Sequence, residues 1–190
     1  WYHIVGWHDA AGNTVNIQVN NTTANSAAHT AGTQDRTEAM QIGNMPTVNQ
    51  LWDGQIDEIA LWKRTLTVAE RTQLYEDGLD LHGVGSGRIY RQADTTIKIE
   101  GTGSEKLEIG RPQVDSSTVG LWHLDETSSG ATDIKDSSPN ANNSTSNSSS
   151  SVDGFFGKAR SFNGTSNKIP ISTAAIIGSL STSSVEAWIY

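Results

Sequence analysis

The sequence contains no cysteine and few basic residues, and both absences narrow what the protein can be. Without cysteine the fold has no disulfide framework, and thiol chemistry is excluded. The 13 lysine and arginine residues are scattered along the chain against 21 acidic residues, which gives a formal net charge of −8. A nucleic-acid partner requires clustered positive charge, so no such partner is expected.

Long apolar runs are missing as well. No stretch of about 18 apolar residues occurs, so no membrane span is predicted. The chain begins with Trp1-Tyr2-His3 rather than with a methionine followed by a basic and apolar leader, so no signal peptide is predicted. We therefore expect the chain to be a piece of a longer protein.

Aromatic residues make up only 7% of the chain, yet six of them are tryptophan. Glycine, serine, threonine and asparagine are abundant and long helical patterns are few, a balance typical of an all-β secreted protein. Alternating apolar residues predict a hairpin over 1–20 and further strands at 39–43 and 55–63. In the last of these the alternation breaks near Glu58, which indicates a β-bulge.

One helix is predicted after these strands. Thr67 supplies the N-cap hydroxyl, Glu70 completes a capping box three residues later, and Gly78 is expected to end the helix. A helix of about three turns is too short to build a core of its own. We therefore expect it to lie against a sheet.

The rest of the chain alternates between polar and strand-like stretches. Residues 85–117 are polar and glycine-rich, which predicts a linker with a small hairpin. Residues 136–151 are nearly all serine, asparagine and threonine, which predicts a long, mobile loop. Strands are predicted around this loop, at 119–124, 159–162, 168–171 and 185–190.

Two blocks of residues carry a resemblance to a known fold family. The first contains Trp52-Asp53-Gly54-Gln55-Ile56-Asp57-Glu58-Ile59-Ala60-Leu61-Trp62 and then Arg64-Thr65-Leu66-Thr67. The second contains Gly120-Leu121-Trp122-His123-Leu124-Asp125-Glu126 and Val185-Glu186-Ala187-Trp188-Ile189. They resemble, respectively, the C-terminal and N-terminal halves of laminin G-like domains in the concanavalin A-like lectin/glucanase superfamily. The resemblance implies an all-β fold, an antiparallel β-sandwich of the concanavalin A-like jelly-roll type, with one short helix.

The two halves stand in reversed order for a single domain. We divide the chain into 1–84, a C-terminal half, 85–117, the linker, and 118–190, the N-terminal half of a following domain. Tandem laminin G-like repeats cut out of phase explain this order most simply. Two alternatives are a circularly permuted single fold, in which both halves pack together, and an exchange of strands between neighbouring copies.

Because the superfamily includes glucanases, a hydrolase has to be considered. Retaining glycosidases need two carboxylates about 5 Å apart, which a Glu-x-Asp-x-x-Glu strand would supply. Around Asp57, the two outer positions of that pattern are occupied by Gln55 and Ala60. Both essential carboxylates are missing and the histidines lack metal-ligand spacing, so we predict that the protein is not an enzyme.

Calcium is the cofactor that the resemblance suggests, since laminin G-like relatives often hold one ion. Oxygen-rich loops suit this hard cation, which takes about six to eight ligands. The residues that could contribute are Asp57, Asp125, Asp136 and Asn163. The alternative is that these side chains bond the local backbone as turn and cap residues, because no compact alternating acidic loop is present.

The tryptophans suggest carbohydrate binding, because a sugar ring stacks on an exposed indole. Four of the six lie within strand patterns, Trp62 among them, and are predicted to belong to the core. Trp7 and Trp52 are the better candidates for exposure and therefore for ligand binding.

Together these features predict a non-catalytic module that is secreted or lies at the cell surface and serves binding, adhesion or spacing in a larger protein. Its expected partners are a glycan or a protein at the cell surface, and neighbouring laminin G-like repeats or subunits. The alternative is an accessory carbohydrate-binding domain attached to a glycoside hydrolase.

Overall fold

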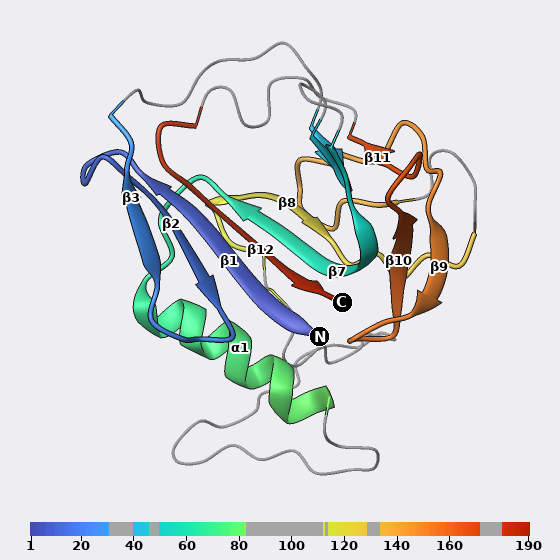
Figure 1. Ribbon diagram of the computed structural model, residues 1–190, viewed down its shortest axis with the longest axis horizontal. Coiled ribbons are helices and arrows are strands. Elements are labelled where there is room, and N and C mark those ends of the chain that lie inside the picture. The colour runs from blue at the N-terminus through green and yellow to red at the C-terminus, as the bar shows by residue number, and fades with distance from the viewer. Residues whose placement is uncertain (31–39, 46–49, 83–111, 113, 129–133, 172–179) are drawn as a thin grey trace.

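The computed structural model describes residues 1–30, 40–45, 50–82, 112, 114–128, 134–171 and 180–190. Within them the chain forms mainly β-strands and one helix (Figure 1). The elements in chain order are β1 (Tyr2–Asp9), β2 (Thr14–Val19), β3 (Asn25–Ala28), β4 (Gln41–Ile42), β5 (Asn44–Met45), β6 (Gln50–Leu51), β7 (Asp53–Trp62), α1 (Val68–His82), β8 (Thr118–Trp122), β9 (Ser150–Asp153), β10 (Lys158–Asn163), β11 (Ile169–Pro170) and β12 (Ser183–Ile189).

Eight strands form one antiparallel sheet in the order β3-β2-β1-β12-β7-β10-β9, with β8 also paired to β7. Figure 1 shows β12, from the end of the chain, lying between β1 and β7. Its register places Ala187 opposite Ile4, and Glu186 opposite Ala60. The two blocks of the sequence therefore pack together in one sheet. The division of the chain at residues 84 and 117, and its origin in tandem repeats, stay predictions.

The strand β7 is central in this sheet and carries the predicted bulge. β12 pairs along one side of β7, while β10 and β8 pair with successive parts of the other side. The register between β7 and β12 shifts beside Glu58, which has a φ of 51°. That left-handed conformation is uncommon outside glycine and fits the extra residue of a bulge. The bulge predicted near Glu58 is confirmed.

The two faces of β7 contribute to two separate cores. Ile59 and Leu61 belong to the first core, whereas Ala60 and Trp62 belong to the second. Because successive strand residues point to opposite faces, a strand that is buried on both faces is apolar at almost every position. This double burial explains why the end of β7 lacks polar alternation. The first core comprises Ile42, Ile56, Ile59, Leu61, Trp122, Leu124, Ile134, Phe162, Ile169 and Ile171, and the second comprises Val5, Ala60, Trp62, Leu66 and Leu121.

A second layer of short strands covers the first core. β4 pairs with β11, and β5 pairs with β6, both outside the main sheet. Ile42 of β4 lies opposite Ile169 of β11, and both side chains are buried in the first core. The predicted fold class, an antiparallel β-sandwich with one short helix, is confirmed.

The helix α1 begins where the sequence predicts but ends later. The Glu70 amide donates to Thr67 Oγ1 at 3.2 Å and the Thr67 amide donates to Glu70 Oε2 at 2.7 Å, so the capping box is formed. The predicted end at Gly78 is wrong, because α1 continues to His82. Gly78 instead permits close approach to the sheet, since a Cβ there would overlap the Trp188 ring. Across the described residues, no helix combines the length and apolarity needed to cross a membrane.

Residues 136–151 contradict the prediction of a mobile loop. The buried side chain of Asp136 accepts hydrogen bonds from the backbone amides of Leu121 and Asn142, at 2.9 and 2.8 Å. The Trp122 indole in turn donates to the Asn142 carbonyl at 2.9 Å. Composition predicts mobility where few apolar side chains can be buried. Here buried polar side chains fix the backbone instead.

Candidate binding site

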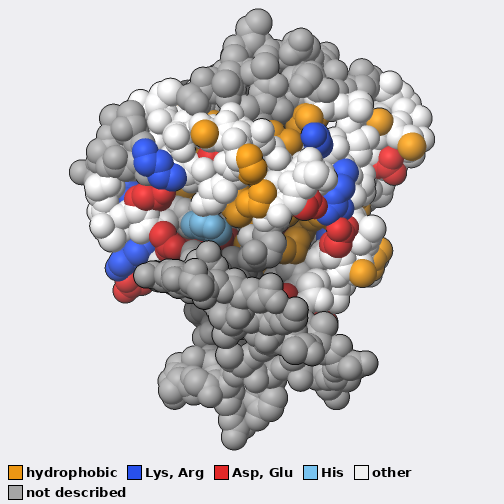
Figure 2. All heavy atoms as spheres, turned by 180° about the vertical axis from the view of Figure 1, so that it is seen from behind, with side chains coloured by type: hydrophobic (Ala, Val, Ile, Leu, Met, Phe, Trp, Pro, Cys, Tyr) orange, Lys and Arg blue, Asp and Glu red, His pale blue; other side chains and the backbone are white. Residues whose placement is uncertain are grey.

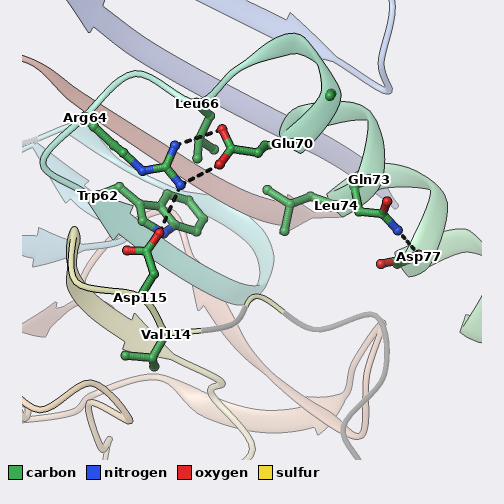
Figure 3. A pocket seen from close by; sticks show the side chains of 10 residues that line it. Trp62, Arg64, Leu66, Glu70, Gln73, Leu74, Asp77, Val114 and Asp115 are labelled. Carbon is green, nitrogen blue, oxygen red and sulfur yellow. Dashed lines mark hydrogen bonds and ion pairs between the residues drawn. The ribbon is translucent and has the colours of Figure 1, made fainter. Parts of the chain in front are cut away.

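A pocket of about 440 Å³ lies beside α1, close to the end of β7 (Figure 3). Its volume falls within the range of small-molecule sites, about 300 to 1,000 Å³. Apolar side chains form its floor, while charged and amide side chains stand at its edge. We call this cavity the α1 pocket. Its apolar residues are Trp62, Leu66, Ala69, Leu74 and Val114, and its polar residues are Arg64, Glu70, Gln73, Asp77 and Asp115.

The local sequence explains how the walls arise. Trp62 ends β7 and is buried in the second core together with Leu66. The capping box then starts α1, and residues three and four apart along the helix share one face toward the pocket. The facing wall is a turn in which Asp115 Oδ1 accepts hydrogen bonds from the amide and the hydroxyl of Ser117, at 2.7 and 2.6 Å. Such an Asx turn fixes the position of the Asp115 carboxylate.

Arg64 is held in a network that uses all of its donors. It forms a bidentate pair with Glu70, with Nη1 2.8 Å from Oε2 and Nη2 2.7 Å from Oε1. Nη2 also donates to Asp115 Oδ2 at 3.0 Å, and Nε donates to Ser117 Oγ at 2.8 Å. A longer bond of 3.5 Å joins Nη1 to the Thr65 carbonyl. A guanidinium has five N–H groups, so Arg64 has none left for a ligand.

This network lowers the pKa values of both carboxyl groups. The hydrogen bond from Arg64, assisted by bonds from Thr67, outweighs burial and lowers the pKa of Glu70 to about 2. Burial acts to raise the pKa of Asp115, but hydrogen bonds from Ser117 and Arg64 lower it to about 2. The bond to Glu70 raises the pKa of Arg64 in return. All three groups are therefore charged at neutral pH.

A second polar pair lies at the other end of the α1 pocket, away from Arg64 (Figure 3). Gln73 Nε2 donates to Asp77 Oδ1 at 2.6 Å, one helical turn along α1. The pocket thus has one positive side chain, Arg64, against the three negative ones of Glu70, Asp77 and Asp115, a formal charge of −2. On the face that Figure 2 displays, lysine and arginine side chains also lie beside acidic ones.

Trp7, one of the two predicted ligand-binding residues, is half-buried. It packs against the second core, and the guanidinium carbon of Arg71 lies 4.1 Å from the centroid of its ring. Gln18 fixes Arg71 there, because its Oε1 accepts a hydrogen bond from Arg71 Nε at 2.8 Å. One face of the Trp7 ring is therefore covered by a cation of the protein itself.

Trp52, the other predicted ligand-binding residue, is also half-buried and packs against the first core. It directly precedes β7, whereas Trp7 lies opposite Ser184, which pairs with Trp62 at the far end of β7. A strand of this length spans roughly 30 Å, so the two indoles are not brought into one site. A binding role for either stays a prediction.

The four predicted calcium ligands lie in three places. Asp57 and Asp125 approach the same turn, between β9 and β10. Asp57 Oδ2 accepts a hydrogen bond from the Phe156 amide, and Asp125 Oδ1 accepts one from the Lys158 amide, each at 2.8 Å. Glu58 follows Asp57 in the chain and His123 lies two residues before Asp125; Oε2 of the buried Glu58 is 2.7 Å from Nδ1 of His123.

The other two predicted calcium ligands bond their own loops. Asp136 holds 136–151 as described above, and Asn163 Oδ1 accepts bonds from the amides of residues 165–167 at 2.9 to 3.1 Å. Within the part of the chain that the structure describes, no three histidine or acidic side chains gather in a way that could hold a metal ion. A calcium site at the four residues stays a prediction.

Sequence reasoning missed the α1 pocket, although some of its signals were present. The run Asp115-Ser116-Ser117-Thr118 has the composition of an Asx turn. Most of this run falls within the predicted linker. Trp62 is predicted to be a core residue, with no role in a pocket. Nothing in the spacing indicates that Arg64 meets Asp115, because only the pairing of β7 with β8 brings the two segments together.

Comparison with known proteins confirms the predicted resemblance for the first part of the chain. Residues 1–70 match the family model described as the concanavalin A-like lectin/glucanases superfamily. No curated protein and no solved structure matches the chain. The matched residues extend from β1 to the first turn of α1 and include Arg64 and Glu70 of the pocket. Over these residues the chain is similar to the concanavalin A-like lectin/glucanase superfamily, and its antiparallel sandwich is consistent with that fold.

Proposed function

We propose that the chain is a non-catalytic binding module of a larger protein that is secreted or lies at the cell surface, and that the α1 pocket is its binding site. The observation that carries this proposal is the pocket, which joins an apolar floor to a polar edge at the size of a ligand site. The match of residues 1–70 to a superfamily of lectins and glucanases supports it.

The titration of the pocket residues supports a non-catalytic role. A general acid or base works best when its pKa lies near the working pH. Glu70 and Asp115 have pKa values of about 2 because of Arg64 and their other donors. Carboxyl groups with pKa values this low stay ionised at neutral pH. They can hold and orient a ligand, but they exchange no proton with it.

The partners of this module, in our proposal, are a glycan or a protein at the cell surface, and neighbouring repeats or subunits of the larger protein. The alternative function is that of an accessory carbohydrate-binding domain of a glycoside hydrolase. Under that alternative, the partly exposed indoles of Trp7 and Trp52 make the sugar contacts.

Glycan-array binding of matched variants tests the proposal. Ala69→Arg places a long side chain in the α1 pocket, whereas Val68→Arg makes the same charge change at the neighbouring exposed residue, which does not line the pocket. We expect ligand binding to fall in the first variant and persist in the second. Loss of binding in Trp7→Ala or Trp52→Ala, with Ala69→Arg unaffected, would favour the accessory domain. Absence of any ligand would contradict a binding role and leave that of a spacer.

A further inference from the structure

The charge and lining of the α1 pocket point to the chemistry of its ligand. We infer that the pocket takes a lysine or arginine side chain presented by a protein partner. This inference rests on the proposed function, because it specifies the ligand of the same site.

The edge of the α1 pocket selects a cation. Arg64 is its one positive side chain, and all five of its N–H groups are donated within the protein, so no donor of Arg64 is free for an anion. Glu70, Asp77 and Asp115 leave the lining at a formal charge of −2. At Asp77 the described hydrogen bond, from Gln73, reaches Oδ1, and Oδ2 faces the pocket end as a further acceptor.

The floor of the α1 pocket selects an aliphatic stem. Trp62 is only 3% exposed, so its indole lacks the open face on which a sugar ring stacks. The accessible part of the floor comes from the aliphatic carbons of Leu74, Ala69 and Val114, because Leu66 is as buried as Trp62. Lysine and arginine bury their methylene stems against such surfaces while the charged head reaches polar groups. An aliphatic floor with an acidic edge therefore complements a basic side chain better than it complements a sugar.

A set of amino-acid probes tests this inference. N-acetyl-lysine methylamide and its arginine counterpart are titrated into the isotope-labelled chain, and the amide signals of residues 69, 73 and 77 are followed by NMR with the indole N–H of Trp62. Norleucine and glutamate methylamides are the matched neutral and anionic probes. We expect the basic probes to bind about two- to fivefold more tightly than norleucine, the range expected for one well-placed exposed ion pair. The glutamate probe should not bind.

Variants that change the charge of the α1 pocket test the inference further. Asp77→Asn should weaken lysine binding about two- to fivefold, and Ala69→Glu should strengthen it by a similar factor. Asp153→Asn and Val68→Glu make the same charge changes at exposed positions outside the pocket and should leave the affinity unchanged. Because these contacts are solvent-exposed, the difference between the lysine and norleucine probes should shrink as salt is added.

The outcomes separate this inference from the proposed function. Equal affinities for the lysine and norleucine probes, or equal responses of the pocket and control variants, would overturn the inference. A glycan whose binding is lost in Ala69→Arg while the basic probes fail to bind would also overturn it, yet would keep the α1 pocket as a binding site. If neither the probes nor any glycan or protein binds, both proposals fail.

Discussion

Two regions of the molecule are held together in different ways. Around the second core, β1, β7, β8 and the start of α1 bury apolar side chains such as Val5 and Leu66. Around the first core, the segments between β8 and β10 bury Leu124 and Ile134 but are also fixed by buried polar side chains. Asp136 holds one segment, and the fully buried Arg160 donates to the carbonyls of Glu126 and Ser149, each at 2.7 Å.

This difference predicts where single substitutions should matter most. Apolar contacts are many and individually weak, so their loss is graded. A buried charge that bonds several backbone groups leaves all of them unsatisfied when it is removed. The region around the first core, where buried polar side chains fix the backbone, should therefore be the more fragile of the two, although its composition resembles that of a loop.

Asp136→Ala should have the largest effect. It removes the acceptor of the Leu121, Ser138 and Asn142 amides, and we expect the free energy of unfolding to fall by about 3–5 kcal/mol. Urea unfolding measures this, with Asp136→Asn as the control that keeps one acceptor and loses less. A loss below about 1 kcal/mol would show that the segment does not depend on this side chain.

Gly78→Ala tests the apolar region where α1 packs closely on the sheet. In an exposed helix this change stabilises by about 1 kcal/mol. Here the new methyl group would overlap the Trp188 ring, so we expect a net loss of about 1–2 kcal/mol from overpacking. Glu76→Ala, an exposed change on the same helix, should stay within about 0.5 kcal/mol. Stabilisation by Gly78→Ala would mean that α1 can move away from the sheet at little cost.

The features that could be predicted from the sequence are those that residues close together in the chain determine. The capping box of Thr67 and Glu70 and the bulge at Glu58 were correct, because neighbouring residues specify them. By the same local rules, Gly78 is an equally good residue to end the helix. Its actual role depends on Trp188, more than 100 residues away in the chain, which no local rule includes.

The candidate site was beyond sequence reasoning for the same reason. Trp62 was correctly assigned to the core, yet it also forms the floor of the α1 pocket. At the edge of the α1 pocket, Arg64 bonds Asp115, which lies 51 residues later in the chain. This contact depends on strand pairing between the two blocks, and their reversed order made that pairing hard to predict. Trp7 is predicted to bind a ligand because it is an aromatic residue expected to be exposed, but Arg71, which covers one face of its ring, comes from a different element.

A buried pair beneath α1 gives the apolar region one pH-dependent element. His3 Nε2 lies 2.8 Å from Glu186 Oε2, and burial raises the pKa of Glu186 while the bond to His3 opposes the rise. A carboxyl group with a raised pKa adds stability below its unfolded value of 4.5 and loses that contribution as the pH rises through the folded value. Glu186→Gln should therefore flatten the dependence of stability on pH above 4.5. Unfolding curves from pH 4 to 8 measure this, and profiles parallel to the wild type would exclude Glu186 as the source.

The smallest effect is expected at the acidic edge of the α1 pocket. The lowered pKa of Asp115 adds stability above its unfolded value of 3.8, and that contribution is lost as the pH falls toward 2. Because the side chain is 43% exposed, solvent screening reduces the contribution to about 0.5 kcal/mol, so Asp115→Asn should change unfolding at pH 7 by no more than that. Asp153→Asn serves as the exposed control. A loss above about 2 kcal/mol would place Asp115 with Asp136, among the residues that hold the fold. If the loss is small while the affinity for basic probes falls, the charges at this edge contribute to ligand binding more than to folding.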